Sequence, residues 1–303
     1  MKVNQLLQGA MMTAIYLLLL ILYNMGIFPT MISLALPLPL MVHGARSSSV
    51  KDVALVFLAC LIGSFVVASI LGVGTTLIFG LAGTILGIGL VRKWPYWQRI
   101  INASLVYLIA LPVFTYLMSG VHLGTSLVEI ISESMALTES LPFAGDNVPD
   151  LQEFQDMVAT LIPQLLPTIL LLVGLASALV SDALGKFILK RLRLEYPRSE
   201  NFSRFQLGAL IALAYVLTQF LLRAELGDAL QVMVINIYFT LNLLFMVQGI
   251  VVATAFLRSR GRSRLAPVLV IFALLGNFGA LFSTLGVFDA FWDLRKRMVK
   301  RFD

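Results

Sequence analysis

The charged residues of this chain are absent from the middle of its long apolar runs. Asp, Glu, Lys and Arg make up only 13% of the 303 residues, whereas 59% are hydrophobic. The apolar runs are about 20 residues long, which is the length that an α-helix needs to cross a bilayer. A segment that spans lipid must be helical, because lipid offers no partner to backbone N–H and C=O groups. The pattern therefore predicts an all-α, polytopic helical membrane protein.

Nine apolar segments can be distinguished. They cover residues 6–24, 27–42, 53–70, 73–91, 100–119, 157–181, 205–222, 229–257 and 265–287. The second segment is short and contains Pro37 and Pro39, so we expect a kinked or partly re-entrant helix there. About eight or nine membrane helices are predicted, and the side on which the chain ends is left open. Nine crossings would place a basic tail outside, and that tail holds Arg295, Lys296, Arg297, Lys300 and Arg301.

Basic residues mark alternate loops. Lys and Arg follow the second, fourth, sixth and eighth segments, whereas residues 120–156 carry seven acidic residues and no Lys or Arg. Because Lys and Arg accumulate in cytoplasmic loops, the N-terminus is predicted to be cytoplasmic and the acidic loop external. We expect the protein in the plasma (inner) membrane, in contact with lipid, with its net charge of +6 reflecting these loops and not a nucleic-acid partner.

The apolar segments divide the chain into two parts. Residues 1–181 are expected to form a six-helix membrane core that includes the external acidic loop 120–156. Residues 182–303 are expected to form a basic cytoplasmic loop, two or three further membrane helices and a basic amphipathic tail.

Enzymatic and metal sites lack a sequence signal. Cys60 is the only cysteine, and neither His43 nor His122 lies in a metal-ligand pattern. The chain contains no phosphate-binding GxxxxGK[ST] motif, so ATP-driven work would need a partner with a nucleotide site. We therefore expect no catalytic residues, no metal and no cofactor. The apolar segments also lack ionisable residues near their centres, which disfavours a self-contained ion-coupled carrier.

Small residues on two segments predict close helix contacts. Ala10 and Ala14 are four residues apart on the first segment, and Gly80, Gly83 and Gly87 form a stripe on the fourth. Small side chains let membrane helices approach closely. The contact is either internal packing or, for Ala10 and Ala14, docking onto another membrane protein.

Uncharged polar residues are the candidates for a ligand cavity. In hydrocarbon such groups need partners, which are supplied either by other helices or by a bound small polar or amphipathic molecule. Pro163 and Pro167 favour a cavity on the sixth segment, because a kinked helix frees carbonyl groups. The candidates are Asn102, Tyr107, Gln164, Asn236, Tyr238, Asn242 and Gln248.

Two family resemblances rest on short motifs. The first six segments resemble the substrate-binding S components of energy-coupling-factor transporters, and the whole chain is similar to the YybS-like bacterial membrane proteins. The first resemblance rests on Ala10-x-x-x-Ala14, the Leu36-Pro37-Leu38-Pro39-Leu40 stretch and the glycine-rich fourth segment; the second adds Gln248-Gly249 and Gly286…Asp289…Arg295. The resemblance implies that Ala10 and Ala14 contact a transmembrane coupling protein that carries ATPase subunits. It also implies a ligand site beneath residues 121–151.

Two functions from different classes are compatible with these features. The first is a non-enzymatic subunit that binds a small molecule for uptake and takes its energy from an ATPase-bearing partner. The second is a membrane scaffold or regulator without transport activity. Its basic segments 186–204 and 258–264 would recruit cytoplasmic factors or anionic lipids.

Overall fold

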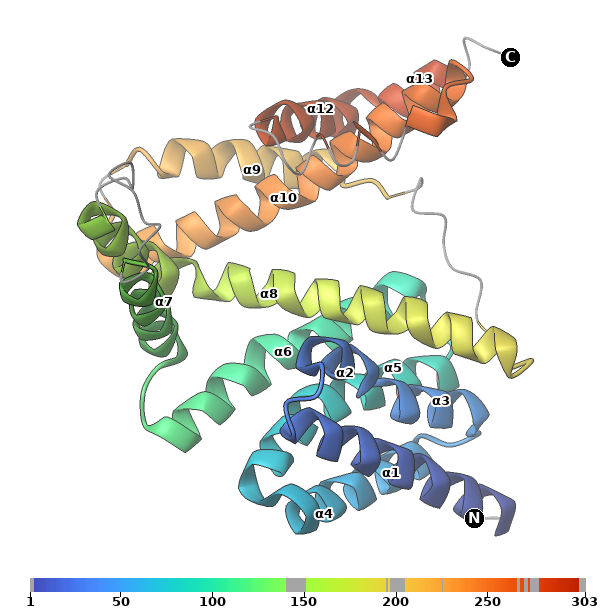
Figure 1. Cartoon of the computed structure of the whole chain (residues 1–303). Helices are drawn as coiled ribbons and strands as arrows, with labels where there is room; N and C mark the ends of the chain where they lie inside the picture. The colour runs from blue at the N-terminus through green and yellow to red at the C-terminus, as the bar shows by residue number, and fades with distance from the viewer. Residues whose placement is uncertain are drawn as a thin grey trace. The chain divides into compact units, whose positions relative to one another are not determined.

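A computed structural model gives the arrangement of the helices (Figure 1). It describes residues 3–139, 151–194, 196, 205–224, 226–265, 268–269, 272 and 278–299. Within these ranges every regular element is helical and there is no β-strand, so the predicted all-α class is confirmed. The chain forms two compact units, Met1–Ser199 and Glu200–Asp303. The first unit extends past the boundary expected at residue 181, because Asp182 and Tyr196 both bind Arg99.

The first unit consists mainly of long apolar helices. Its elements are α1 (Val3–Asn24), α2 (Pro29–Ala35), α3 (Leu38–Arg46), α4 (Val50–Thr75), a π-helical turn (Thr76–Gly80), α5 (Leu81–Val91), α6 (Tyr96–Ser119), α7 (Leu123–Glu139) and α8 (Leu151–Arg191). The apolar segment 27–42 is broken into α2 and α3 at Leu36 and Pro37, where a proline removes a backbone donor. The break expected from Pro37 and Pro39 is confirmed.

The continuous helical stretch Val50–Val91 reverses its direction near residue 69. Ser69 has φ 58° and ψ −153°, which is not a helical conformation. A Cβ atom at Gly72 would lie 2.6 Å from the Ser64 carbonyl oxygen. In a straight helix two residues eight positions apart are separated by about 12 Å, so the chain turns back between them. The early part of α4 runs parallel to α1, with Val56 against Gly9. After the bend, Thr76 accepts a hydrogen bond from Tyr16 of α1. The stretch therefore turns back at the boundary expected between segments 53–70 and 73–91, and the crossing of the membrane by each half stays a prediction.

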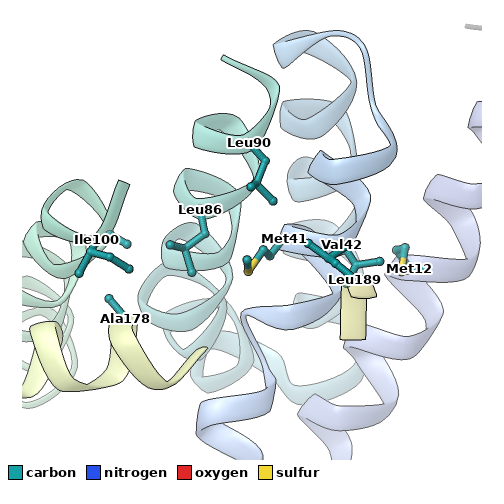
Figure 2. Close-up of a cluster of buried hydrophobic side chains, with 9 residues drawn as sticks. Met12, Met41, Val42, Leu86, Leu90, Ile100, Ala178 and Leu189 are labelled. Atoms are coloured by element: carbon teal, nitrogen blue, oxygen red, sulfur yellow. The ribbon is translucent and has the colours of Figure 1, made fainter. Parts of the chain in front are cut away.

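Apolar side chains from five helices of the first unit share one core (Figure 2). Met12 comes from α1, Met41 from α3, Leu86 from α5, Ile100 from α6 and Leu189 from α8. Where α3, α5 and α8 contribute to this core, they carry or are followed by the basic residues Arg46, Arg92, Lys93 and Lys186. We call this region the basic end of the first unit.

The second unit is built around one long helix. Its elements are α9 (Ala209–Leu221), α10 (Asp228–Ser259), a short 3₁₀ turn (Ser263–Leu265), α12 (Gly279–Trp292) and α13 (Leu294–Val299). α12 lies alongside α10 (Figure 1). Much of the predicted ninth segment, at 266–267, 270–271 and 273–277, lies outside the described residues.

Among the described residues, five helices are long and apolar enough to cross a membrane. They are Leu6–Asn24, Val50–Val91, Tyr96–Ser119, Asp156–Arg191 and Asp228–Ser259, of which the second contains the non-helical residue Ser69. α9 and α12 are apolar but shorter. The polytopic membrane architecture agrees with the sequence, and the number of eight or nine spans stays a prediction.

Candidate functional site

Ala10 and Ala14 lie in an open groove between α1 and α4. Both side chains are exposed, whereas Gly9 beside them is buried. A Cβ atom on Gly9 would lie only 2.9 Å from the Val56 side chain. The groove has a volume of about 450 Å³. Its lining is Leu6, Gly9, Ala10, Thr13, Ala14, Leu17, Leu55, Val56 and Ala59. The small side chains of α1 thus leave an apolar depression into which a partner helix can pack closely. We call it the alanine groove.

Gly80, at the end of the π-helical turn, and Gly83 and Gly87 on α5 bring this part of the chain close to its neighbours. A Cβ atom at Gly83 would overlap the backbone carbonyl of Pro37, and one at Gly87 would lie 2.8 Å from the Leu40 carbonyl oxygen. Gly80 faces the Tyr16 hydroxyl in the same way, at 3.0 Å. These three glycines therefore lie at internal contacts with α3 and α1.

The ligand-cavity candidates of the first unit line none of its three described cavities. Tyr107 is buried in the core, with its ring 5.8 Å from that of Phe79. Asn102 is half-buried on α6, and Gln164 lies on α8 next to Pro163. None of them lines the alanine groove or either of the other two cavities described below. Part of the region expected to cover a ligand, residues 140–150, lies outside the described residues.

The candidates of the second unit are engaged with other protein groups. Asn242 accepts a hydrogen bond of 2.8 Å from the Tyr215 hydroxyl, and the Tyr238 ring stacks on that of Tyr215 at 5.6 Å. Asn236 donates to the Val232 carbonyl of its own helix. Gln248 is fully buried and bonds on both sides, as described below. Asn242, Tyr238 and Gln248 thus contact groups outside α10, whereas the bond of Asn236 lies within it, and a ligand role for the four residues stays a prediction.

A buried ionic cluster joins α6 and α8 at the basic end. Arg99 and Asp182 are 1% and 2% exposed and form an ion pair of 3.0 Å. The Tyr196 hydroxyl accepts a bond of 2.6 Å from Arg99 Nη2 and donates one to Asp182. Burial raises the pKa of Tyr196, and the Asp182 charge raises it further, so the phenol stays protonated. Arg99 Nη1 has no hydrogen-bond partner among the described residues.

Sequence reasoning missed this cluster. Arg99 and Asp182 each lie one residue outside a predicted apolar segment, where a charge indicates the end of a crossing. Both residues lie outside the centres of the predicted segments but inside helices long enough to span, so buried ionisable residues occur near the ends of these helices. A cavity of about 610 Å³ lies beside Tyr196 and is lined also by Gly44, Ala45, Ser47, Ser48, Leu90, Val91 and Lys93.

A second buried network joins α10, α12 and α13. Gln248 Nε2 donates to Asp289 Oδ2 over 2.9 Å, and Arg295 Nη2 forms an ion pair of 2.8 Å with the same oxygen. Gln248 Oε1 accepts from the Leu207 backbone N–H at 2.8 Å. Gly249 and Gly286 lie so close to the opposite helix that a Cβ on either would overlap a carbonyl, of Phe282 and Phe245 respectively. The two short motifs, Gln248-Gly249 and Gly286…Asp289…Arg295, therefore meet in a single contact between helices.

Comparison with known proteins decides the family. The family described as "Predicted membrane protein (DUF2232)" matches residues 12–290. The chain belongs to this family. It is 22% identical to the "Uncharacterized protein YybS" of Bacillus subtilis (strain 168) over 311 residues, which cover 98% of this chain and 99% of that protein. No solved structure matches the chain.

The family description agrees with the apolar helices of the structure. The family is described as one of membrane proteins, and the match covers helices of both compact units. The predicted YybS-like relationship is confirmed. Among the described residues, no group of three or more His, Cys, Asp or Glu side chains is placed to hold a metal ion.

Proposed function

We propose that this protein is a non-enzymatic subunit of a membrane uptake system, which binds a small molecule in the manner of an S component. A separate transmembrane partner with ATPase subunits would supply the energy. The observation that carries the proposal is the alanine groove, in which Ala10 and Ala14 of α1 are exposed. Gly9 of the same helix packs against Val56 of α4, so it is not available to a partner.

The position of the groove fits such a partner. Leu6 and Leu55 lie near the beginnings of α1 and α4, next to the basic end of the unit. The positive-inside rule assigns the basic end to the cytoplasm. A coupling protein that receives work from cytoplasmic ATPases would therefore meet the groove in the inner half of the membrane.

The proposal places the ligand on the opposite side, beneath residues 121–151. There α7 packs on α8, with Gly124 against Pro163. The two internal prolines of α8, Pro163 and Pro167, free carbonyl groups in the same half of the helix.

The test is purification of the full-length protein from native membranes in mild detergent, followed by identification of bound proteins by mass spectrometry. We expect stoichiometric recovery of a transmembrane coupling protein with its ATPases. Ala10→Leu and Ala14→Leu fill the groove and should abolish that recovery while the protein stays folded. Ala54→Leu is the matched control, because Ala54 is exposed on α4 but does not line the groove.

Two outcomes count against the proposal. Normal assembly of both groove variants would remove any docking role for Ala10 and Ala14. Recovery of the protein alone, or only with soluble cytoplasmic proteins, would favour the scaffold function, in which the basic segments do the recruiting.

A further inference from the structure

A second groove of the first unit lies on a different face of α1 from the alanine groove. It has a volume of about 370 Å³ and runs between α1, the α2–α3 pair and the last turns of α8. Its lining is Met11, Met12, Ile15, Leu19, Ala35, Leu38, Pro39, Val42, Arg46, Ile188 and Leu192. Every lining residue but Arg46 is apolar. We call it the Arg46 groove.

The size of the groove fits one extended hydrocarbon chain. The α1 residues that line it, from Met11 to Leu19, span about 12 Å along the helix axis, which is most of one leaflet of a bilayer core about 30 Å thick. A helix of that length and about 10 Å in diameter occupies roughly 900 Å³, so it would lie mainly outside the groove. Met11, Ile15 and Leu192 are each at least 40% exposed, so the protein does not cover this face.

Arg46 supplies a positive charge at one end of this apolar surface. It lies in the last turn of α3, at the basic end, and it is half-buried. The described residues give it neither a hydrogen bond nor an ion pair. A guanidinium next to hydrocarbon is stabilised by an anion, and it binds phosphate oxygens in a bidentate manner. Arg191 lies three residues after Ile188 and hence on the same side of α8, which adds a second cation nearby.

We infer that the Arg46 groove binds one anionic phospholipid. An acyl chain lies along Met11, Ile15 and Leu19, and the phosphate binds the Arg46 guanidinium at the basic end. Charge and length together select this ligand, because a zwitterionic lipid fills the same groove but carries a positive group that opposes Arg46. The inference does not depend on the proposed uptake function, since it concerns another face of α1.

The experiment measures lipid binding to the full-length protein in detergent by native mass spectrometry, with phosphatidylglycerol and phosphatidylcholine of equal chain length as probes. The wild-type protein should bind phosphatidylglycerol more tightly. Arg46→Gln should weaken that binding about fivefold, as expected for one basic residue at an anionic surface. Lys51→Gln is the control, because Lys51 is an exposed cation of the same end that does not line the groove.

A second variant tests the hydrocarbon part of the site. Ala35→Phe places a ring in the groove and should reduce the binding of both lipids, whereas Arg46→Gln should reduce only the preference for phosphatidylglycerol. Equal binding of the two lipids to the wild-type protein, or unchanged binding by Arg46→Gln, would overturn the inference. So would equal losses in Arg46→Gln and Lys51→Gln, which would indicate diffuse attraction by the basic end.

Discussion

Arg99 on α6 and Asp182 on α8 form an ion pair of 3.0 Å that is closed off from the surroundings, with Tyr196 bonded to both. A buried pair of this kind fixes the two helices relative to each other at the basic end. Its strength lies in the cost of separating the partners, because a single remaining charge has no water to stabilise it.

Removal of either charge should therefore destabilise the protein strongly. Arg99→Met or Asp182→Leu alone should lower the free energy of unfolding by about 3–5 kcal/mol. The double variant should lose clearly less than the sum, because no unpaired charge remains. Unfolding in detergent micelles, followed for all four proteins of the cycle, gives the coupling. Additive losses would show that the two side chains do not act as a pair.

Tyr196 should make a pH-dependent contribution. Its raised pKa means that the folded protein holds the neutral phenol. The contribution of Tyr196 to the free energy of unfolding is therefore complete below the ordinary pKa of 10.0 and declines as the pH rises above it. Tyr196→Phe should cost about 1–3 kcal/mol at pH 8 through the lost hydrogen bonds. The difference in melting temperature between Tyr196→Phe and wild type should shrink at pH 10.5. Tyr116→Phe, at a more exposed tyrosine, is the control.

Gly249 and Gly286 should tolerate no side chain. Alanine at either position would overlap a backbone carbonyl of the opposite helix, and relief of such an overlap costs about 1–3 kcal/mol. Gly279→Ala is the matched control on the same helix, because its nearest neighbour is the flexible Met246 sulfur at 3.4 Å. Thermal unfolding should show Gly249→Ala and Gly286→Ala well below wild type and Gly279→Ala within about 0.5 kcal/mol of it. Three equal shifts would argue against the close contact.

The reversal at Ser69 should be visible by cysteine labelling. In a Cys60→Ala background, we would introduce Ser48→Cys, Ser69→Cys and Lys93→Cys one at a time, all at exposed positions. A membrane-impermeant maleimide should reach residues 48 and 93 from one side of the membrane and residue 69 from the other. Labelling of residues 48 and 93 from opposite sides would mean a single crossing and contradict the reversal.

The apolar pattern predicts the helices well but their contacts poorly. Segments 53–70 and 73–91 are recognisable as two segments because together they are about twice as long as one helix needs to cross a bilayer core about 30 Å thick. Pro37 likewise predicts its own break, since the effect of proline is local. The sites that depend on a distant partner are different. Asp182 and Asp289 look like ordinary charges at segment ends, and only packing brings them to Arg99 and Gln248.

The ligand candidates illustrate the same limit. Asn242 and Tyr238 share a helix with Asn236 and Gln248, which in a sequence is compatible with either helix bonding or a cavity. The structure gives each of the first two a Tyr215 contact, and it gives Gln248 the buried Asp289 carboxylate. A polar residue in an apolar segment reports that a partner exists, without identifying it.

The reciprocal contact of Gly249 and Gly286 also limits how this chain can evolve. Each glycine faces the carbonyl that lies four residues before the other, so the two positions form one symmetric contact. A larger residue at either position moves the helices apart and thereby removes the reason for the other glycine. Among relatives, positions 249 and 286 should therefore stay small together or change together, and the intermediate with one glycine lost should be rare.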